Sequence, residues 1–276
     1  MAQLILLGLP LGNMDDLTRR QEKALKEGHH FICEDTRNLI KILQILNVSR
    51  EGKTLWSFHD QSAGEEIDKL VKEIKKVGTV YLVSDAGSPL ISDPGYPLIR
   101  ACLEQGVDID TYPGPSSPIV ALELMGLQPL PFHFHGFFPR EKDKRQQKIA
   151  EISRQKGTHL FFESPYRVHE CADALAQAFP ENKLALAREL TKLFQTIHRF
   201  VGKDWESERP KLEVRGEFVV AVELTEVLEV PNADRKTREL AQEVLNKKGK
   251  AKELAKLLSH LLGDATNEIY QALISK

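Results

Sequence analysis

Apolar and polar positions along the first half of the chain predict strands that alternate with helices. The apolar runs Leu4–Leu7, Phe31–Cys33 and Thr79–Val83 have the length and composition of buried strands. Between such runs, segments such as Glu65–Lys76 repeat apolar residues every three or four positions, as an amphipathic helix does. Strands that alternate with helices of this length predict βαβ units and a mostly parallel sheet.

The alternation resumes after Met125–Pro131, a stretch rich in Gly and Pro that is typical of a domain boundary. Phe194–Val201 and Glu217–Leu224 alternate in the manner of antiparallel strands with one face in water, which predicts a mixed sheet. From Pro231 onward no strand pattern remains. Three short helices are expected there, over 233–248, 251–262 and 267–274.

These patterns predict an α/β protein with two α/β domains, residues 1–126 and 127–230, followed by a basic helical tail at 231–276. The 276 residues are enough for two medium domains, and 41% hydrophobic with 28% charged residues is ordinary for a soluble globular protein. No apolar stretch approaches about 18 residues, so no membrane-spanning helix is expected. The N-terminus lacks the basic start of a secretory signal peptide.

Cysteine content and net charge exclude some classes of protein. The three cysteines, Cys33, Cys102 and Cys171, are far apart, which favours reduced thiols in a cytoplasmic protein over a zinc site or a disulfide framework. A formal net charge of −2 argues against a protein that coats nucleic acid by bulk charge. Two basic stretches, Arg140–Lys148 and Arg235–Lys256, can either contact phosphates or form solvated helix faces.

Three loops that follow predicted strands in the first half consist largely of Gly, Pro and small polar residues: Gly8–Asn13, Ser84–Pro97 and Pro113–Pro118. Ligands bind outside the carboxyl ends of parallel strands, so we expect the three loops to line one pocket. The first loop does not match the spacing of the dinucleotide-binding fingerprint, and no Walker A sequence occurs. Asp85, at the end of a buried strand, offers a carboxylate that suits a sulfonium or ammonium ligand.

Seven motifs occur in an order that resembles the tetrapyrrole methylase superfamily. They are G-L-P-L-G-N from Gly8, C-E-D-T-R from Cys33, the segment Ser84–Gly95, P-G-P-S from Pro113, F-E-S-P-Y-R from Phe162, R-E-L-T-K from Arg188 and G-E-F from Gly216. The long motif Ser84–Gly95 is highly specific, and the match covers nearly the whole chain. The resemblance implies two α/β domains with S-adenosylmethionine in the cleft between them, and a homodimer.

Within the superfamily, the chain is similar to the branch that methylates the ribose 2′-hydroxyl of a cytidine in the decoding region of 16S ribosomal RNA. The implied partner is small-subunit rRNA or the assembled 30S subunit. Two departures from the usual pattern occur, at Leu9 in the first loop and at Asp60–Ala63 after His59. The second lies in a predicted RNA-facing loop, so it bears on the acceptor more than on the cofactor. By position, the implied cofactor contacts are Leu9, Pro10, Asp85, Ser88, Ser116, Ser117, Phe162, Ala187 and Glu217.

A ribose hydroxyl is a weak nucleophile, so a general base or hydrogen-bond acceptor should assist it. The candidate catalytic residues are Glu34, Asp35 and His59, with Asp15 or Asp16 as further carboxylates near loop tips. The acids of the C-E-D-T-R motif also fit the N-terminus of a helix. The candidate RNA contacts are Arg37, which can pair a phosphate or brace Glu34, and Arg140, Lys142, Lys144 and Arg145.

Two alternatives to RNA methylation stay open. One is a methyltransferase with another acceptor, such as a tetrapyrrole carbon or a modified protein histidine; the other is a non-catalytic ribosome-binding protein. The basic stretches favour RNA over a tetrapyrrole, and Asp85, Ser116 and Glu217 favour an enzyme over a binding protein. No metal is expected. His133 and His135 share one face of a strand, but no third ligand is close in sequence.

Overall fold

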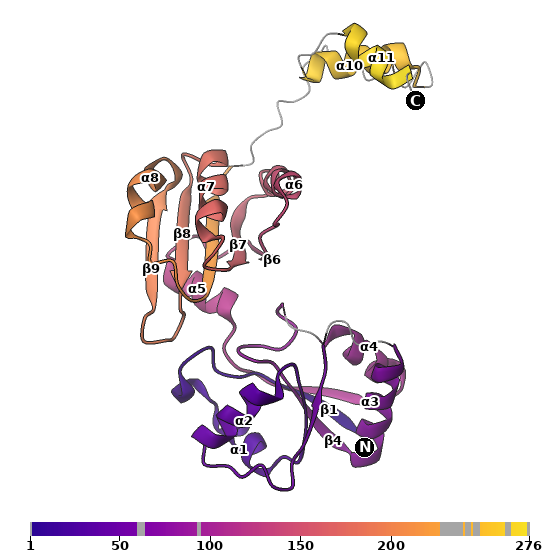
Figure 1. Ribbon diagram of the computed structural model, residues 1–276, viewed down its shortest axis with the longest axis vertical. Helices are drawn as coiled ribbons and strands as arrows, with labels where there is room; N and C mark the ends of the chain where they lie inside the picture. The colour runs from indigo at the N-terminus through magenta and orange to yellow at the C-terminus, as the bar shows by residue number, and fades with distance from the viewer. Residues whose placement is uncertain are drawn as a thin grey trace. The chain divides into compact units, whose positions relative to one another are not determined.

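The computed structural model describes residues 2–59, 64–92, 95–226, 240, 244, 249–262 and 266–274. They belong to two compact units, Met1–Glu226 and Val227–Lys276. The first unit contains two five-stranded sheets with helices packed against them (Figure 1). In the described part of the second, α10 (Ala251–Leu262) packs against α11 (Thr266–Ile274). The predicted α/β fold with a helical extension is confirmed. Most of the predicted helix at 233–248 lies outside the described residues.

The first sheet is parallel throughout, with strand order β3-β2-β4-β1-β5. Leu7, the last residue of β1, is level with Val83 on β4 and with Tyr112 on β5. The chain therefore leaves three adjacent strands at the same edge of the sheet. The strands are β1 (Gln3–Leu7), β2 (His30–Cys33), β3 (Thr54–Ser57), β4 (Thr79–Val83) and β5 (Asp108–Tyr112).

Helices cover both faces of this sheet because its central strands are apolar on both sides. On β1, Leu7 packs with residues of the first two helices and Leu4 packs with residues of the next two. Figure 1 shows the two pairs on opposite sides of β1 and β4. The helices are α1 (Arg19–Glu27) and α2 (Thr36–Ile45) on one face, and α3 (Gly64–Val77) and α4 (Tyr96–Glu104) on the other.

The second sheet is mixed, as the sequence predicts, with strand order β6-β7-β10-β8-β9. The parallel pair is β6 with β7, whereas β10 is antiparallel to both of its neighbours. β9 is antiparallel to β8. The strands are β6 (Phe132–Phe137), β7 (Gly157–Glu163), β8 (Lys183–Arg188), β9 (Thr196–Val201) and β10 (Phe218–Leu224).

The prediction that the β10 segment has one face in water is wrong. Every residue from Phe218 to Leu224 is buried, because β10 is the central strand of its sheet. α7 (Val168–Ala178) packs on one face of β10 and α5 (Ser117–Met125) on the other. α5 precedes the predicted domain boundary at residue 126, yet it packs on the second sheet.

The remaining helices of the first unit are α6 (Lys142–Ile152), the short α8 (Trp205–Glu208) and the 3-10 helices η1 (Met14–Asp16), η2 (Gly202–Asp204) and η3 (Arg209–Lys211). No helix in the described ranges has the length and apolar character needed to cross a membrane. Within the same ranges, no group of three His, Cys, Asp or Glu side chains is arranged to hold a metal ion.

Three histidines of β6 and β7 stack on one another beside α6. The ring centroids of His133 and His159 are 4.7 Å apart, and those of His135 and His159 are 5.3 Å apart. Nε2 of His135 lies 3.0 Å from Nδ1 of His159, which is fully buried. Burial, with the neighbouring His159 and Lys148, lowers the pKa of His135 from 6.5 to about 4. Burial lowers the pKa of His159 as well.

The histidine cluster should make the folded protein less stable in acid. Between pH 6.5 and about 4 the unfolded chain protonates the position of His135 while the folded chain keeps it neutral. The free energy of unfolding is therefore highest above pH 6.5 and falls as the pH decreases towards 4. His135→Phe keeps the ring stack on Phe161 and removes one titrating group. Urea unfolding at pH 5 and pH 7 should show a smaller difference for the variant; an equal difference would contradict this origin.

Candidate functional site

Gln21 on α1 joins two of the loops at the carboxyl edge of the first sheet. Its Nε2 donates to the carbonyl oxygens of Gly8, at 2.7 Å, and Pro113, at 3.0 Å. Its Oε1 accepts from the backbone N–H of Thr18, whose hydroxyl in turn accepts from the N–H of Gln21. The fully buried carboxamide therefore caps α1 and satisfies two loop carbonyls at once.

The two loops joined by Gln21 touch through their glycines. A Cβ added at Gly8 would lie 2.9 Å from the backbone nitrogen of Gly114. A Cβ at Gly114 would lie 2.6 Å from Nε2 of Gln21. Both distances are shorter than a carbon atom tolerates, so the loops after β1 and β5 approach this closely only because both residues are glycine.

The loop after β4 is tied to the first loop by backbone hydrogen bonds. The N–H groups of Leu9 and Gly87 each donate to the other's carbonyl, at 2.8 and 2.9 Å. The hydroxyl of Ser84 also donates to the Gly87 carbonyl at 2.8 Å. Gly87 has a φ of +73°, which favours glycine. The S-D-A-G segment is thus a fixed turn, and the three loops meet as the sequence predicts.

A cavity of about 240 Å³ lies between these loops and the second sheet. Four of the nine predicted cofactor residues line it: Asp85, Ser117, Phe162 and Glu217. Leu9 and Ala187 are instead buried in the core. Ser116 is the N-cap residue of α5 but makes no side-chain capping hydrogen bond. Pro10, Ser88 and Ser116 are not among the lining residues.

The cavity is also lined by residues that are not among the predicted cofactor contacts. Leu11 lines it instead of Leu9, because Leu9 faces the core packed under α1 and α2. Phe137 lines it beside Phe162, with ring centroids 5.7 Å apart. Phe137, the last residue of β6, pairs with Phe162 on β7 after a shift in register, and this pairing follows from the sheet order rather than from the sequence pattern.

Glu163 gives the cavity wall a buried carboxylate. Its side chain is 1% exposed, and Oε1 accepts from Nη2 of Arg167 at 2.6 Å and from the N–H of Ser164 at 2.7 Å. Burial raises the pKa of Glu163, and these hydrogen bonds oppose the rise. The F-E-S-P-Y-R motif therefore supplies both a buried acid and its partner, four residues apart.

A second, polar cavity of about 370 Å³ adjoins the first. It brings together all three predicted catalytic residues, Glu34, Asp35 and His59, with the predicted RNA contact Arg37. Asp85 lines both cavities, and its Oδ1 accepts from the N–H of Asp35 at 3.3 Å. The cavity is formed where the neighbouring strands β2 and β3 end, so residues far apart in sequence share it.

Asp35 and Arg37 form a local clamp within the polar cavity. Oδ1 of Asp35 caps α2 by accepting from the Arg37 N–H at 2.8 Å, and the carboxylate accepts from Nε and from Nη2, the latter at 2.6 Å. These hydrogen bonds lower the pKa of Asp35 to about 2. Such a carboxylate is a poor proton acceptor at neutral pH, so the geometry favours positioning over proton transfer for Asp35. Arg37 thus braces Asp35.

The other charged candidates lie outside both cavities. Asp15 and Asp16 are exposed on η1. On α6, Lys144 pairs with Glu141 at 2.9 Å, and Arg145 pairs with Glu170 with only 15% of its side chain exposed. Arg140 and Lys142 are exposed at the start of this segment. Much of the basic stretch is thus a helix face whose charges are matched locally.

The chain is similar in sequence to a known family of proteins. The sequence model of the Tetrapyrrole (Corrin/Porphyrin) Methylases matches residues 3–204. Ribosomal RNA small subunit methyltransferase I of Thermotoga maritima is 34% identical over 80% of this chain and 98% of its own length. The protein of the same name from Mesorhizobium japonicum is 34% identical over 98% of this chain and 91% of its own. The chain belongs to the ribosomal RNA small subunit methyltransferase I family of tetrapyrrole methylases.

A solved structure supports the same fold at lower identity. Uroporphyrin-III C-methyl transferase from Thermus thermophilus, complexed with S-adenyl homocysteine, matches with a TM-score of 0.54 and 16% identity. The match covers 83% of this chain and 99% of the other. The likeness shows that this chain shares the fold of that structure.

Gln21→Leu should destabilise the first sheet and its loops. Leucine has a similar size but cannot donate, so the carbonyls of Gly8 and Pro113 stay buried without a partner and α1 loses its capping box. We expect the free energy of unfolding to fall by about 1–3 kcal/mol, measured by urea denaturation. Gln147→Leu, on the exposed face of α6, is the matched control and should change it little. Equal effects of the two variants would contradict the role of Gln21.

Proposed function

We propose that this protein is an S-adenosylmethionine-dependent 2′-O-methyltransferase of a cytidine ribose in the decoding region of small-subunit (16S) rRNA. Its family membership supports the substrate class, since the relatives are named for small-subunit rRNA. The observation that carries the chemistry is Asp85, which lies on the wall between a cavity with apolar sides and a polar cavity. Methyl transfer requires the donor and the acceptor to be bound next to each other. Asp85 lines both cavities and so lies where a donor in one and an acceptor in the other would meet.

The first cavity fits S-adenosylmethionine by the chemistry of its lining. Leu11 and Phe162 give apolar and aromatic surfaces for a base, and Asp85 and Glu217 give carboxylates for positively charged groups. Ser117 adds a hydroxyl at the start of α5. When bound, S-adenosylmethionine supplies a methyl group carried on a positively charged sulfur. Asp85, Ser117, Phe162 and Glu217 are the residues that would hold it.

The polar cavity would hold the acceptor ribose. There the protein has to orient the 2′-oxygen and accept its proton, and Glu34 and His59, which line the cavity, are our candidates for that transfer. Asp35 acts through its backbone, because its N–H holds Asp85 while its carboxylate is held by Arg37. The side chain of Arg37 is 84% exposed, so a backbone phosphate can reach its guanidinium.

Basic residues outside the two cavities would add contacts to the RNA backbone. Arg140 and Lys142 are the candidates for further phosphate contacts, whereas Lys144 and Arg145 would first have to leave their acidic partners. The substrate is small-subunit rRNA, either free or in the assembled 30S subunit. A homodimer remains a prediction of the family resemblance.

The polar cavity also bears on the alternative acceptors. Glu34, Asp35 and Asp85 make its lining rich in acids. Tetrapyrrole precursors carry several carboxylates, more than Arg37 can match in this lining, whereas a ribose offers hydroxyls that donate hydrogen bonds to the acids and a single neighbouring phosphate for Arg37. A non-catalytic ribosome-binding protein would need neither cavity. The geometry therefore favours a neutral hydroxyl acceptor.

Asp85→Asn should weaken cofactor binding and abolish methylation. The variant keeps the size of the side chain but removes the charge that faces both cavities. Calorimetry should show S-adenosylmethionine binding weakened by about tenfold or more. Asp108→Asn, at the exposed start of β5, is the matched control and should bind as the wild type does. Unchanged binding by Asp85→Asn would remove Asp85 from this role.

The acceptor is tested in cells. Ribose methylation of 16S rRNA is mapped by mass spectrometry in a strain lacking the gene and in the same strain complemented with wild type or Asp85→Asn. We expect one 2′-O-methylcytidine to disappear on deletion and to return with the wild type alone. If no ribose methyl group is lost on deletion, the RNA function is overturned, whatever the binding data show.

A further inference from the structure

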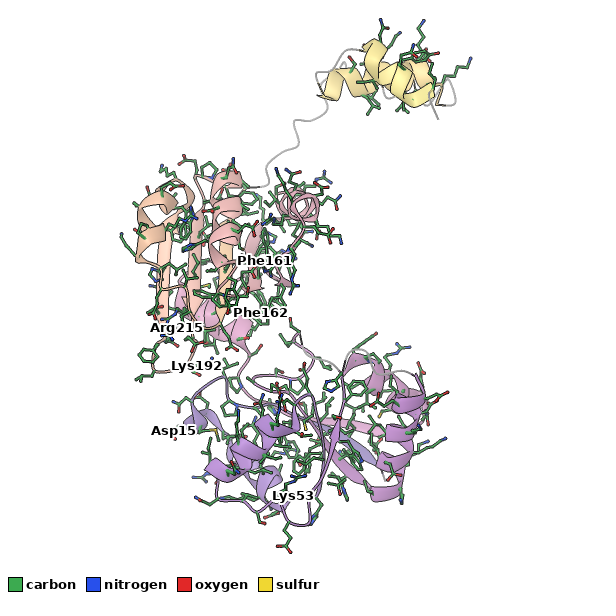
Figure 2. The ribbon with its side chains drawn as sticks, in the orientation of Figure 1. Asp15, Lys53, Phe161, Phe162, Lys192 and Arg215 are labelled. Carbon is green, nitrogen blue, oxygen red and sulfur yellow. The ribbon has the colours of Figure 1, made fainter. Side chains whose placement is uncertain are left out.

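Lys192 lies in the connection between β8 and β9, at the end of the second sheet that faces the first-half loops (Figure 2). Its Nζ donates to Oε1 of Glu189 at 3.0 Å and to Oε2 of Glu217 at 2.7 Å. Burial alone would lower the pKa of Lys192, but these two partners raise it above its ordinary value. The side chain therefore stays a cation at neutral pH, which makes it unsuited to accept a proton.

The backbone around Lys192 is held in an unusual conformation. Glu189 and Thr191 have φ values of 50° and 63°, in the left-handed region that non-glycine residues rarely adopt. For the β-branched Thr191 this conformation is costly, and its hydroxyl is buried with no hydrogen-bond partner. A turn that only joins two strands requires neither feature. Strain of this kind persists where the surrounding structure needs the geometry.

Glu217, directly before β10, holds this turn in place. Its N–H donates to Oε1 of Glu189 at 2.9 Å, and its carbonyl accepts from the Glu189 N–H at 3.0 Å. The adjacent Gly216 has a φ of +81°, and a Cβ there would collide with the Glu189 carboxylate. Glu189, Lys192 and Glu217 thus form one unit, which we call the ion cluster.

The ion cluster also reaches the first sheet's loops. The methylene groups of Lys192 lie directly against Gly12, so that a Cβ at Gly12 would collide with Cγ of Lys192. Gly12 follows Leu11, which lines the first cavity, and Leu190 and Glu217 line the same cavity from the other side. Lys192 is therefore in contact with both walls of the cavity.

We propose that Lys192 is a positioning residue for the first cavity: it holds the carboxylate of Glu217 at the cavity and the loop Gly8–Asn13 against the second sheet. The Glu217 side chain is 80% exposed, so without Lys192 it would sample many rotamers. Removing the cation would also leave two carboxylates facing each other across the turn. This inference rests on the proposed function, in that S-adenosylmethionine is taken as the occupant.

Lys192→Met tests the role, because methionine retains an apolar stem and removes the charge. Calorimetry with S-adenosylmethionine should show binding weakened by about tenfold, and Lys192→Arg should recover most of the loss. Lys211→Met is the matched control, since Lys211 also pairs with a glutamate three residues earlier, Glu208, but lines neither cavity. Wild-type affinity in Lys192→Met would overturn the proposal.

A double-mutant cycle separates positioning from general damage. If Lys192 acts through Glu217, then Lys192→Met should weaken binding much less in a Glu217→Gln background than in the wild type. Fully additive effects would overturn the coupling. Gly12→Ala would push the Lys192 side chain away from the first loop without removing a charge, because the added Cβ collides with Cγ of Lys192. It should also weaken binding, and it serves if Lys192→Met does not fold.

Steady-state kinetics completes the test. A positioning role should raise the KM for S-adenosylmethionine by about tenfold and change kcat at saturating cofactor little. A fall in kcat with unchanged KM would place Lys192 in the chemical step and overturn the proposal. Failure of the wild type to bind S-adenosylmethionine would instead overturn the proposed function itself. The two failures are therefore distinguishable.

Discussion

The carbonyl groups freed at the carboxyl edge of the first sheet are the constraint on which the site depends. β1 and β5 end side by side, and the chain after each must leave the sheet without stranding a buried carbonyl. Gln21, in the first turn of α1, donates hydrogen bonds to a carbonyl of each loop, that of Gly8 after β1 and that of Pro113 after β5. The start of that helix, the path of two loops and one wall of the cavity are therefore a single unit. A larger residue at Gly8 or Gly114 would separate them.

Carboxylates surround the two cavities. Some of these carboxylates are paired with an arginine, and the others are not. Asp35 and Glu163 are each held by an arginine, so their charges serve to fix the backbone nearby. Asp85 receives one long hydrogen bond from the Asp35 N–H and faces both cavities. Glu217 is exposed and held through a lysine. The acids with arginine partners thus hold the backbone of the cavity walls, whereas the carboxylates of Asp85 and Glu217 remain accessible to a ligand.

Much of this could be predicted from the sequence, for reasons that are local. Gly- and Pro-rich loops after apolar runs predict the pocket, because the carboxyl ends of neighbouring parallel strands lie at the same edge of the sheet. The faces of β10 could not be predicted, because its central place follows from pairing with β7 and β8, far away in the chain. The exchange of Leu9 for Leu11 at the cavity has the same origin. Which side of a loop faces the core depends on the helices packed beneath it.

The ion pairs of α6 show that a basic stretch in the sequence is not by itself evidence of an RNA-binding surface. On α6 the basic residues alternate with acids three positions away, and Arg145 turns to Glu170 on α7. A helix whose charges are matched in this way contributes little net field, and the net charge of −2 adds no attraction for phosphates. On the proposed function, nonspecific attraction to phosphates from this helix is weak. Selection of the acceptor nucleotide then depends on the polar cavity, where Arg37 and the acids around His59 can read one ribose and its phosphate.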